Sequence, residues 1–484
     1  MVHHPILARF PALSGLGWRL APTRPDLHTA SLHPERLPAF VRNCPSAMRF
    51  LDLVGPLPWN QFPERNLLRN WGRTTIPHAA FSATCLLKLN ENLVSMDDVR
   101  GYLIEHPAFI WLLGFPLVHS AQYPWGFDPS ASLPTQRHFT RLLREMSNSG
   151  LEFLLEQSAH LLLVQFTSLD ICAGECISLD TKHILAWVKE NNPKAYVANR
   201  FNKTCQPAGD PDCKLGCKRK HNQRTSKEEW HPTPTSEPLP ADLIQVGEFY
   251  WGYASGIVVV KVQDQGEFVL AEITQSFDRP DVSYFFPLMA KTEKTLGFRP
   301  RFGTFDAAFD AWYVYDYFHR QDDPEAFAAV PFSEKGGYKA HGRRFSPSGA
   351  PLCAAGLVMP LQFTYTDRTV SIIPHERGKY ICPRRFPKRS PKGCPAHHKN
   401  WKKNGCTVVM PISIGARLRY TLDRDSDKYK NVYRQRTAVE RINSQALALS
   451  IERPHIRNGS AITNINTLIY TLINLRLLHR IKTK

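Results

Sequence analysis

The stretch Tyr429–Glu452, YKNVYRQRTAVERINSQALALSIE, decides how the rest of the sequence is interpreted. Each residue of an α-helix turns by about 100°, so Tyr433, Arg436 and Glu440 fall in one stripe about 60° wide. Position 447 falls in the same stripe and is a leucine. The opposite side is apolar, with Val439, Ile442, Ala446 and Leu449. The pattern predicts an amphipathic helix that packs on a core and presents a hydroxyl, a guanidinium and a carboxylate on its other side.

Two interpretations of that polar stripe are open. It fits a solvated face with an Arg–Glu pair. The spacing Tyr433-x2-Arg436-x3-Glu440 also resembles the C-terminal signature of the DDE transposases of bacterial insertion sequences. In that family the Glu is the third metal-binding carboxylate, and the Tyr and Arg contact DNA phosphates at the element's end. The family pattern continues with a Lys where this chain has Leu447, so the last phosphate contact is missing.

The charge balance indicates a polyanionic partner. The chain of 484 residues has 61 Lys and Arg against 43 Asp and Glu, a formal net charge of +18. Nucleic acid is the first expectation and a membrane surface the second. The longest apolar run, Ala108–Val118, is too short to span a bilayer, and the N-terminus lacks the pattern of a secretory signal. We therefore expect a soluble, cytoplasmic, nucleoid-associated protein with no membrane partner.

The first 168 residues differ in character from the rest. Residues 1–60 are rich in Pro, Arg and His without a sustained period, and we expect a loosely ordered lead-in. Residues 61–168 carry apolar side chains at helical spacing, as in Phe81–Leu89, which predicts an all-α domain. Several short helices before a catalytic domain suit a DNA-binding module. Because no helix-turn-helix signature stands out, a helical scaffold that touches no DNA is the alternative.

Two further acids follow predicted strands in residues 169–484. Cys176–Asp180 and Arg301–Asp306 each read as a short strand that ends on an aspartate. Asp306 is followed by two alanines, a phenylalanine and Asp310, which resembles the second conserved block of the same transposases. Asp310 itself is expected to be an acid at a helix N-terminus. The resemblance implies an α/β, RNase H-like catalytic core with a long insertion, at about 333–424, before the last catalytic helix.

The same resemblance implies a chemistry for these residues. Asp180, Asp306 and Glu440 would bind Mg²⁺ or Mn²⁺, two ions per site, which clamp the attacking and leaving oxygens of an in-line displacement. The implied reaction is cleavage at the element's ends and strand transfer of the 3′-OH into target DNA, by a homodimer on double-stranded DNA. Tyr433 and Arg436 would position phosphates. The alternatives are an inactive or repurposed transposase-derived DNA-binding protein and an RNase H-like nuclease without strand transfer.

Two groups of cysteines could bind metal. The basic segment 202–231 contains Cys205, Cys213, Cys217 and His221, which permit zinc but match no standard finger spacing. In the basic insertion, a structural Zn²⁺ could be held by Cys382, Cys394, His397 and Cys406. The alternative for the insertion is a solvated basic loop with incidental thiols, which would also suit a phosphate backbone.

Overall fold

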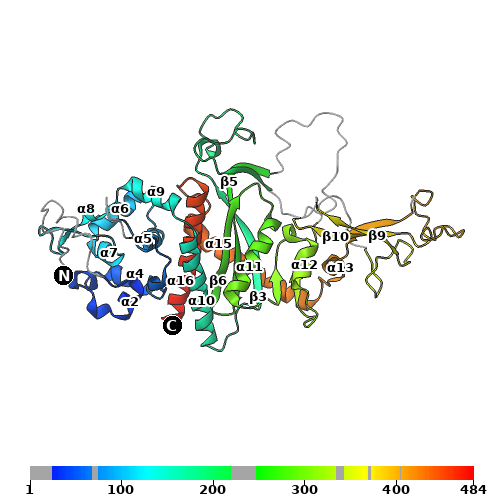
Figure 1. The fold of residues 1–484 in the computed structure, drawn as a ribbon, viewed down its shortest axis with the longest axis horizontal. Helices are drawn as coiled ribbons and strands as arrows, with labels where there is room; N and C mark the ends of the chain where they lie inside the picture. Colours follow the sequence, from blue (N-terminus) through cyan, green and yellow to red (C-terminus); the bar gives the residue numbers. More distant parts are fainter. Residues whose placement is uncertain are drawn as a thin grey trace.

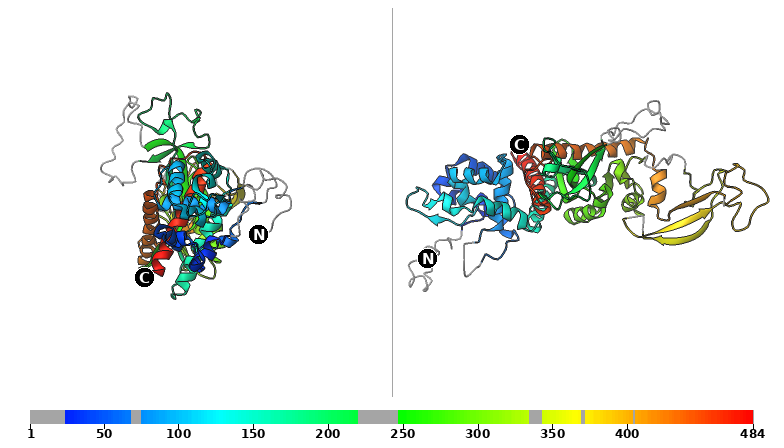
Figure 2. Two further views of the ribbon diagram at one scale, coloured as in Figure 1. Left: turned by 90° about the vertical axis from the view of Figure 1, so that its left-hand side faces the viewer. Right: turned by 90° about the horizontal axis from the view of Figure 1, so that it is seen from above.

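The computed structural model describes residues 24–67, 75–219, 247–333, 343–368, 372–403 and 405–483. They form an elongated molecule with three parts in a row (Figure 1). N-terminal helices lie at one end, a mixed sheet with helices on it lies in the middle, and a small three-stranded sheet lies at the other end (Figures 1 and 2). The predicted α/β class is confirmed at this level.

The N-terminal part is helical from Leu27 onward. Its α-helices are α2 (Leu27–Leu32), α3 (Ala39–Arg42), α4 (Pro45–Val54), α5 (His78–Asn90), α6 (Met96–Glu105), α7 (Pro107–Leu112), α8 (Pro129–Ser132), α9 (Gln136–Glu145) and α10 (Ser149–Thr167). The 3-10 turns η2 (Pro34–Arg36) and η3 (Trp59–Gln61) and the short hairpin of β1 (Val118–His119) and β2 (Phe127–Asp128) connect them.

The expectation of a loosely ordered lead-in is wrong for residues 27–61. Leu27 and Ala30 of α2, and Phe50 and Leu51 of α4, are buried in the main core. The helices here are too short, and too often separated by proline, to show a sustained hydrophobic period in the sequence. Residues 1–23 lie outside the described part of the chain.

The central sheet is organised around the long strand β5 (Gly247–Val262). It pairs antiparallel with β3 (Cys176–Leu185), with β6 (Gly266–Ser276) and, through its first residues, with β4 (Lys214–Arg219). On its other side β3 pairs in parallel with β7 (Phe302–Thr304), which pairs in parallel with β8 (Phe327–Ala329). The valine run Val258–Val260 is fully buried, as expected where β-branched residues form a central strand. β5 and β6 follow one another in the chain and form a hairpin.

Helices cover the sheet and connect it with its neighbours. They are α11 (Phe285–Leu296), α12 (Trp312–Phe318), α13 (Gly415–Thr421), α14 (Asp427–Tyr433), α15 (Thr437–Ala448) and α16 (Gly459–Lys482), with the 3-10 turns η4 (Lys189–Asn191), η5 (Asp281–Tyr284), η6 (Ala307–Phe309) and η7 (Arg434–Arg436). α16 contacts α5, α9 and α10 as well as β6, and lies between the N-terminal helices and the sheet (Figures 1 and 2). One core therefore runs across the expected boundary at residue 168.

The segment between β8 and α14 forms the third part of the molecule. Its strands β9 (Leu361–Asp367), β10 (His375–Ile381) and β11 (Thr407–Pro411) make an antiparallel sheet in the order β11–β10–β9. This sheet stands apart from the central one and gives the molecule its length (Figure 1). No helix in the described ranges is long and apolar enough to cross a membrane.

Asn474 provides a test of how much α16 stabilises the fold. Its side chain accepts a hydrogen bond from the Val269 N–H and donates one to the Val269 carbonyl, both at 2.8 Å, so it completes the pairing of β6 inside the core. We expect Asn474→Ala to lower the free energy of unfolding by about 2–4 kcal/mol, because it leaves two buried backbone groups unpaired. Urea unfolding measures this, with the exposed Thr140→Ala as the control. A loss no larger than the control's would contradict this account.

Candidate catalytic and nucleic-acid-binding site

Two neighbouring parallel strands bring Asp180 and Asp306 to the same level of the sheet. Ser178 of β3 is the register partner of Thr304 of β7, and their hydroxyl oxygens are 3.0 Å apart. Asp180 and Asp306 each follow two residues later. Residues two apart point to the same face, and adjacent strands lie about 4.8 Å apart. The two carboxylates are therefore neighbours on the face that carries Ser178.

The surroundings of these acids differ in detail from the prediction. Asp180 does not end its strand, because β3 continues to Leu185 and only its pairing with β7 ends at Ser178. Asp306 lies two residues beyond β7 and caps η6, accepting a hydrogen bond of 2.8 Å from the Ala308 N–H. Both acids thus sit where the parallel part of the sheet stops.

The predicted helix of residues 429–452 is present, but it contains a tighter turn. α14 leads into the 3-10 turn η7 and then into α15. Ser178 holds η7 against the sheet by donating a 3.0 Å hydrogen bond to the Gln435 carbonyl. The expected apolar side is confirmed as buried: Val439, Ile442, Ala446 and Leu449. On the polar side Arg436 reaches Asp180 of β3.

Arg436 lies between the carboxylates. Its Nη1 is 2.8 Å from Glu440 Oε1, and its Nη2 is 3.4 Å from Asp180 Oδ2. Asp306 and Tyr433 are also close enough to raise the pKa of Arg436, against the opposing effect of burial. The structure therefore brings the other four predicted site residues, Asp180, Asp306, Tyr433 and Glu440, around the guanidinium of Arg436. The buried Nε of Arg436 has no hydrogen-bond partner among the described residues.

Asp180 is the acid most affected by this environment. Burial raises its pKa to about 7, Arg436 opposes the rise, and the negative charge of Asp306 adds to it. A carboxyl group in this condition favours any cation that can replace its lost hydration. The acids present are hard oxygen donors of the type that Mg²⁺ binds. In the described conformation, however, no three Cys, His, Asp or Glu side chains converge closely enough to hold a metal ion, and the Arg436 guanidinium lies where Asp180 and Glu440 meet.

A fourth carboxylate, Asp281 of η5, was missed by sequence reasoning. It accepts a 2.9 Å hydrogen bond from the Thr181 hydroxyl, and its charge also raises the pKa of Asp180. Nothing in its local sequence distinguishes it from an ordinary helix-start acid.

Asp310 was interpreted incorrectly. Its side chain is fully buried, 2.7 Å from Arg419 Nε and 2.9 Å from the Tyr315 hydroxyl, so it anchors α13 to α12.

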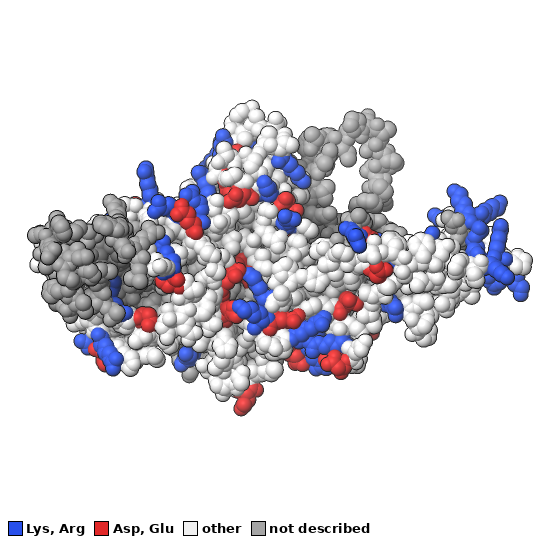
Figure 3. Space-filling model, in the orientation of Figure 1, with Lys and Arg blue, Asp and Glu red and all other residues white. Residues whose placement is uncertain are grey.

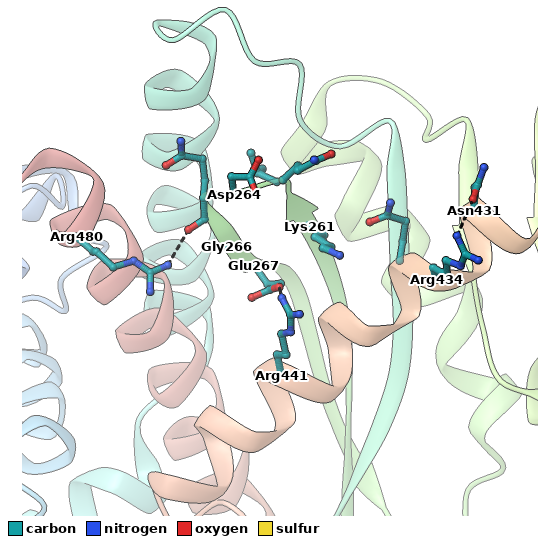
Figure 4. A pocket seen from close by; sticks show the side chains of 12 residues that line it. Lys261, Asp264, Gly266, Glu267, Asn431, Arg434, Arg441 and Arg480 are labelled. Atoms are coloured by element: carbon teal, nitrogen blue, oxygen red, sulfur yellow. Dashed lines mark hydrogen bonds and ion pairs between the residues drawn. The ribbon is translucent and has the colours of Figure 1, made fainter. Parts of the chain in front are cut away.

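A cleft lies beside this site, on the N-terminal half of the same helical stretch (Figure 4). The end of the β5–β6 hairpin forms one wall, with Lys261 and Glu267, and Arg434 and Arg441 line it from η7 and α15. Arg441 pairs with Glu267 at 2.6 Å, whereas Lys261 and Arg434 have no acidic partner within the described ranges. Positive charge is therefore available at Arg434, two residues before Arg436.

The cysteine predictions are met only in part. All eleven cysteines are free thiols. Cys205 and Cys217 are exposed, Cys213 is buried, and His221 lies outside the described residues. In the insertion, Cys382 and Cys406 are buried but His397 is exposed. The His397 N–H donates to the Cys394 carbonyl in a turn that leaves the His397 side chain at the surface, and its role as a zinc ligand stays a prediction.

The arrangement can do two things chemically: hold cations between carboxylates and hold phosphates with guanidinium groups. Comparison with known proteins adds no further guide. No family model matches the sequence, no curated protein matches it, and no solved structure matches the fold. The function is therefore argued from the site.

Replacing Arg436 tests the electrostatics of the site. The guanidinium favours the ionised form of Asp180, so Arg436→Gln should move the pKa of Asp180 upward from about 7. Infrared difference spectra of ¹³C-aspartate-labelled protein across pH follow the carboxyl band, which Asp180→Asn identifies. Arg434→Gln, in the same turn, removes an equal charge that does not contact Asp180. An Asp180 pKa that is equal in both variants would contradict the contact.

Proposed function

We propose that the chain is a DDE transposase that cleaves DNA at the ends of an insertion sequence and transfers the resulting 3′-OH to target DNA. One observation carries the proposal. Asp180 and Asp306, at one level of two parallel strands, face a helical stretch that presents Tyr433, Arg436 and Glu440. The sequence alone does not show that these residues lie close together, so their closeness in space supports the family resemblance.

The architecture supports an RNase H-like core. Three antiparallel strands, β6, β5 and β3, continue into two parallel ones, β7 and β8. Asp180 lies on β3 and Asp306 lies two residues beyond β7, at the junction between the two kinds of pairing, and Glu440 lies on α15, which packs on β3, β5 and β6. The three-stranded extension enters between β8 and α14, where the long insertion was expected.

Asp180, Asp306 and Glu440 would hold two Mg²⁺ or Mn²⁺ ions, with Asp281 close enough to support them. Such ions polarise the scissile phosphate and activate the attacking oxygen. Glu440 is suited to be the ligand that binds the metal last and adjusts its position, because its side chain is 59% exposed. Asp180, only 18% exposed and near Asp306, supplies the fixed negative charge.

Arg436 would move from the acids to the DNA. An i,i+4 ion pair with an exposed carboxylate contributes only about 0.3–0.5 kcal/mol, so a phosphate can replace Glu440 as its partner. A charge-assisted contact with phosphate would also satisfy the free Nε. When Arg436 turns to the DNA, Asp180 and Glu440 are released for metal. Tyr433, one helical turn before, would fix the position of the same backbone.

The distribution of charge supports a DNA partner. Lys and Arg gather at the far end of the three-stranded sheet (Figure 3), where the sequence has a basic loop at residues 384–403. The cleft beside Arg436 adds Lys261 and Arg434. We propose a homodimer on double-stranded DNA, as the family resemblance implies, with each subunit binding one end.

Two other functions use the same fold. A repurposed DNA-binding protein would keep the basic surfaces without turnover, and Leu447, 50% exposed on α15, is the feature that favours it. A nuclease without strand transfer would need the acids but not Tyr433 and Arg436. The experiment below separates all three.

The test uses purified protein and DNA that carries the element's own ends, with Mg²⁺, with Mn²⁺ or with EDTA. Asp180→Asn, Asp306→Asn and Glu440→Gln should each reduce cleavage by at least about 100-fold, since each removes part of a metal effect that contributes several kcal/mol. Asp427→Asn, an exposed acid on α14, is the matched control. Binding without cleavage by the unaltered chain would establish the DNA-binding alternative, and cleavage without joining would establish the nuclease.

Leu447 allows a gain-of-function prediction. It lies on the polar side of α15, where the family has a lysine. Leu447→Lys should tighten binding to the element's ends and steepen the slope of log affinity against log salt by about one unit, because one more phosphate is neutralised. Leu447→Gln, polar but uncharged, is the control. An equal effect of both variants would show that this position does not contact phosphate.

A further inference from the structure

The three-stranded extension has little apolar core of its own. Its buried cluster consists of seven residues, and three of them are cysteines: Cys353, Met359, Tyr380, Cys382, Cys406, Met410 and Ala416. Strand β9 is exposed over most of its length. So small a core does not normally hold a sheet in one arrangement without a disulfide or a metal. All of these cysteines are free thiols.

Two of the cysteines face one another across the end of a strand pair. Ile381 of β10 is the register partner of Thr407 of β11, so Cys382 and Cys406 are the next opposed residues. The surroundings of Gly405 show how closely the ends of the two strands approach one another. A Cβ atom at Gly405 would lie 2.9 Å from Cys382 Cβ and 3.5 Å from Cys382 Sγ. Its φ of +67° also favours glycine.

A third cysteine reaches the same point from a separate turn. Cys353 opens a turn in which the Gly356 N–H donates to the Cys353 carbonyl at 2.9 Å. The N–H of the next residue, Ala354, donates to the thiol of Cys406. The Cys353 turn therefore lies directly against Cys406. A backbone N–H directed at sulfur stabilises a thiolate more than a thiol.

The fourth cysteine lies on the loop that joins β10 to β11. Cys394 opens a turn of the same kind as Cys353, with the His397 N–H donating to its carbonyl at 3.1 Å. A similar turn follows Cys382, where the Arg385 N–H donates to its carbonyl at 2.9 Å. Cys394 is close enough to Cys406 to act on it electrostatically. Three thiols, those of Cys353, Cys382 and Cys406, thus meet at one end of the small sheet, and that of Cys394 lies nearby on the loop.

We propose that Cys353, Cys382, Cys394 and Cys406 bind one structural Zn²⁺. Four thiolates are a complete tetrahedral set for zinc, with Zn–S distances of about 2.3 Å, and leave no open position for catalysis. The thiols are gathered but not yet at ligand distances in the described conformation, so binding would draw Cys394 and its loop inward. The four thiols would lose their protons to solvent as the metal binds.

Zinc binding would affect the basic loop between Cys382 and Cys406 and not the carboxylates of the candidate catalytic site. Within the described part of the loop between Cys382 and Cys406, Arg385 contacts Trp401 by a cation–π contact of 5.6 Å and a hydrogen bond to its carbonyl. A metal at the base of this loop would hold its Lys and Arg side chains as one rigid surface. The proposal does not depend on the proposed function, because a zinc-held extension would serve any polyanion-binding role.

Metal analysis of the full-length protein tests the site. Protein purified without chelator should contain one zinc per chain. Cys353→Ser should lose most of it, whereas His397→Ala and the exposed Cys205→Ser should retain it. Replacement by Co²⁺ should give the intense thiolate charge-transfer and d–d absorption of a tetrahedral sulfur site, reduced in Cys394→Ser. Chelation should expose residues 383–405 to protease while the α16 core stays resistant.

Three results would overturn the proposal: protein without zinc after reconstitution under reducing conditions, zinc unchanged in Cys353→Ser, or zinc lost in His397→Ala. Thiol counting of denatured protein detects the competing outcome, a disulfide among the four cysteines. Because Cys353→Ser could destabilise the extension without any metal, the cobalt spectrum of Cys394→Ser, on an exposed loop, provides an independent measurement.

Discussion

The placement of two like charges side by side, one of them largely buried, is the constraint on which the site depends. Asp180 and Asp306 are placed together by the register of β3 and β7, each two residues beyond the last paired position. Their mutual repulsion adds to desolvation in raising the pKa of Asp180. Arg436 is the counter-charge that the chain itself supplies. The helical stretch around Arg436 must therefore be fixed relative to the sheet, and Ser178 fixes it by bonding to both β7 and η7.

The position of that stretch depends in turn on α16. Buried asparagines and threonines of α16 form hydrogen bonds with β6 and α10. A buried helix of this length would otherwise be expected to pack through apolar side chains alone. Glu272, fully enclosed with a pKa raised by burial, accepts hydrogen bonds of 3.0 Å from Ser255 and Thr467, and so joins β5, β6 and α16. Such polar pairing gives α16 one register, because a shift would leave these groups unpaired. α15 packs on the α16 side of the same sheet.

The sequence could predict whatever depends on local periodicity. The amphipathic stretch around Glu440, the β5–β6 hairpin and the two aspartate-bearing strands all carry local patterns. The short helices before Phe62 do not, since each spans too few residues for a period to be visible. Asp281 and Ser178 act only through tertiary contacts, so no spacing indicates them. Cys353 was overlooked as a partner of Cys406 for the same reason: 53 positions separate them, and only the packing of the Cys353 turn, whose Ala354 N–H donates to Cys406, brings them together.

An arginine among catalytic acids would couple DNA recognition to metal binding. While Arg436 contacts Asp180 and Glu440, it satisfies the charge that would otherwise attract a divalent ion. Binding of a phosphate removes that competition, so DNA and metal should each increase the affinity for the other, as linkage requires. The coupling is limited by the strength of the contacts that are exchanged, on the order of 1 kcal/mol for partly exposed pairs. That is enough for a severalfold preference, and it would favour assembly of the metal site on correctly bound DNA over assembly in the free protein.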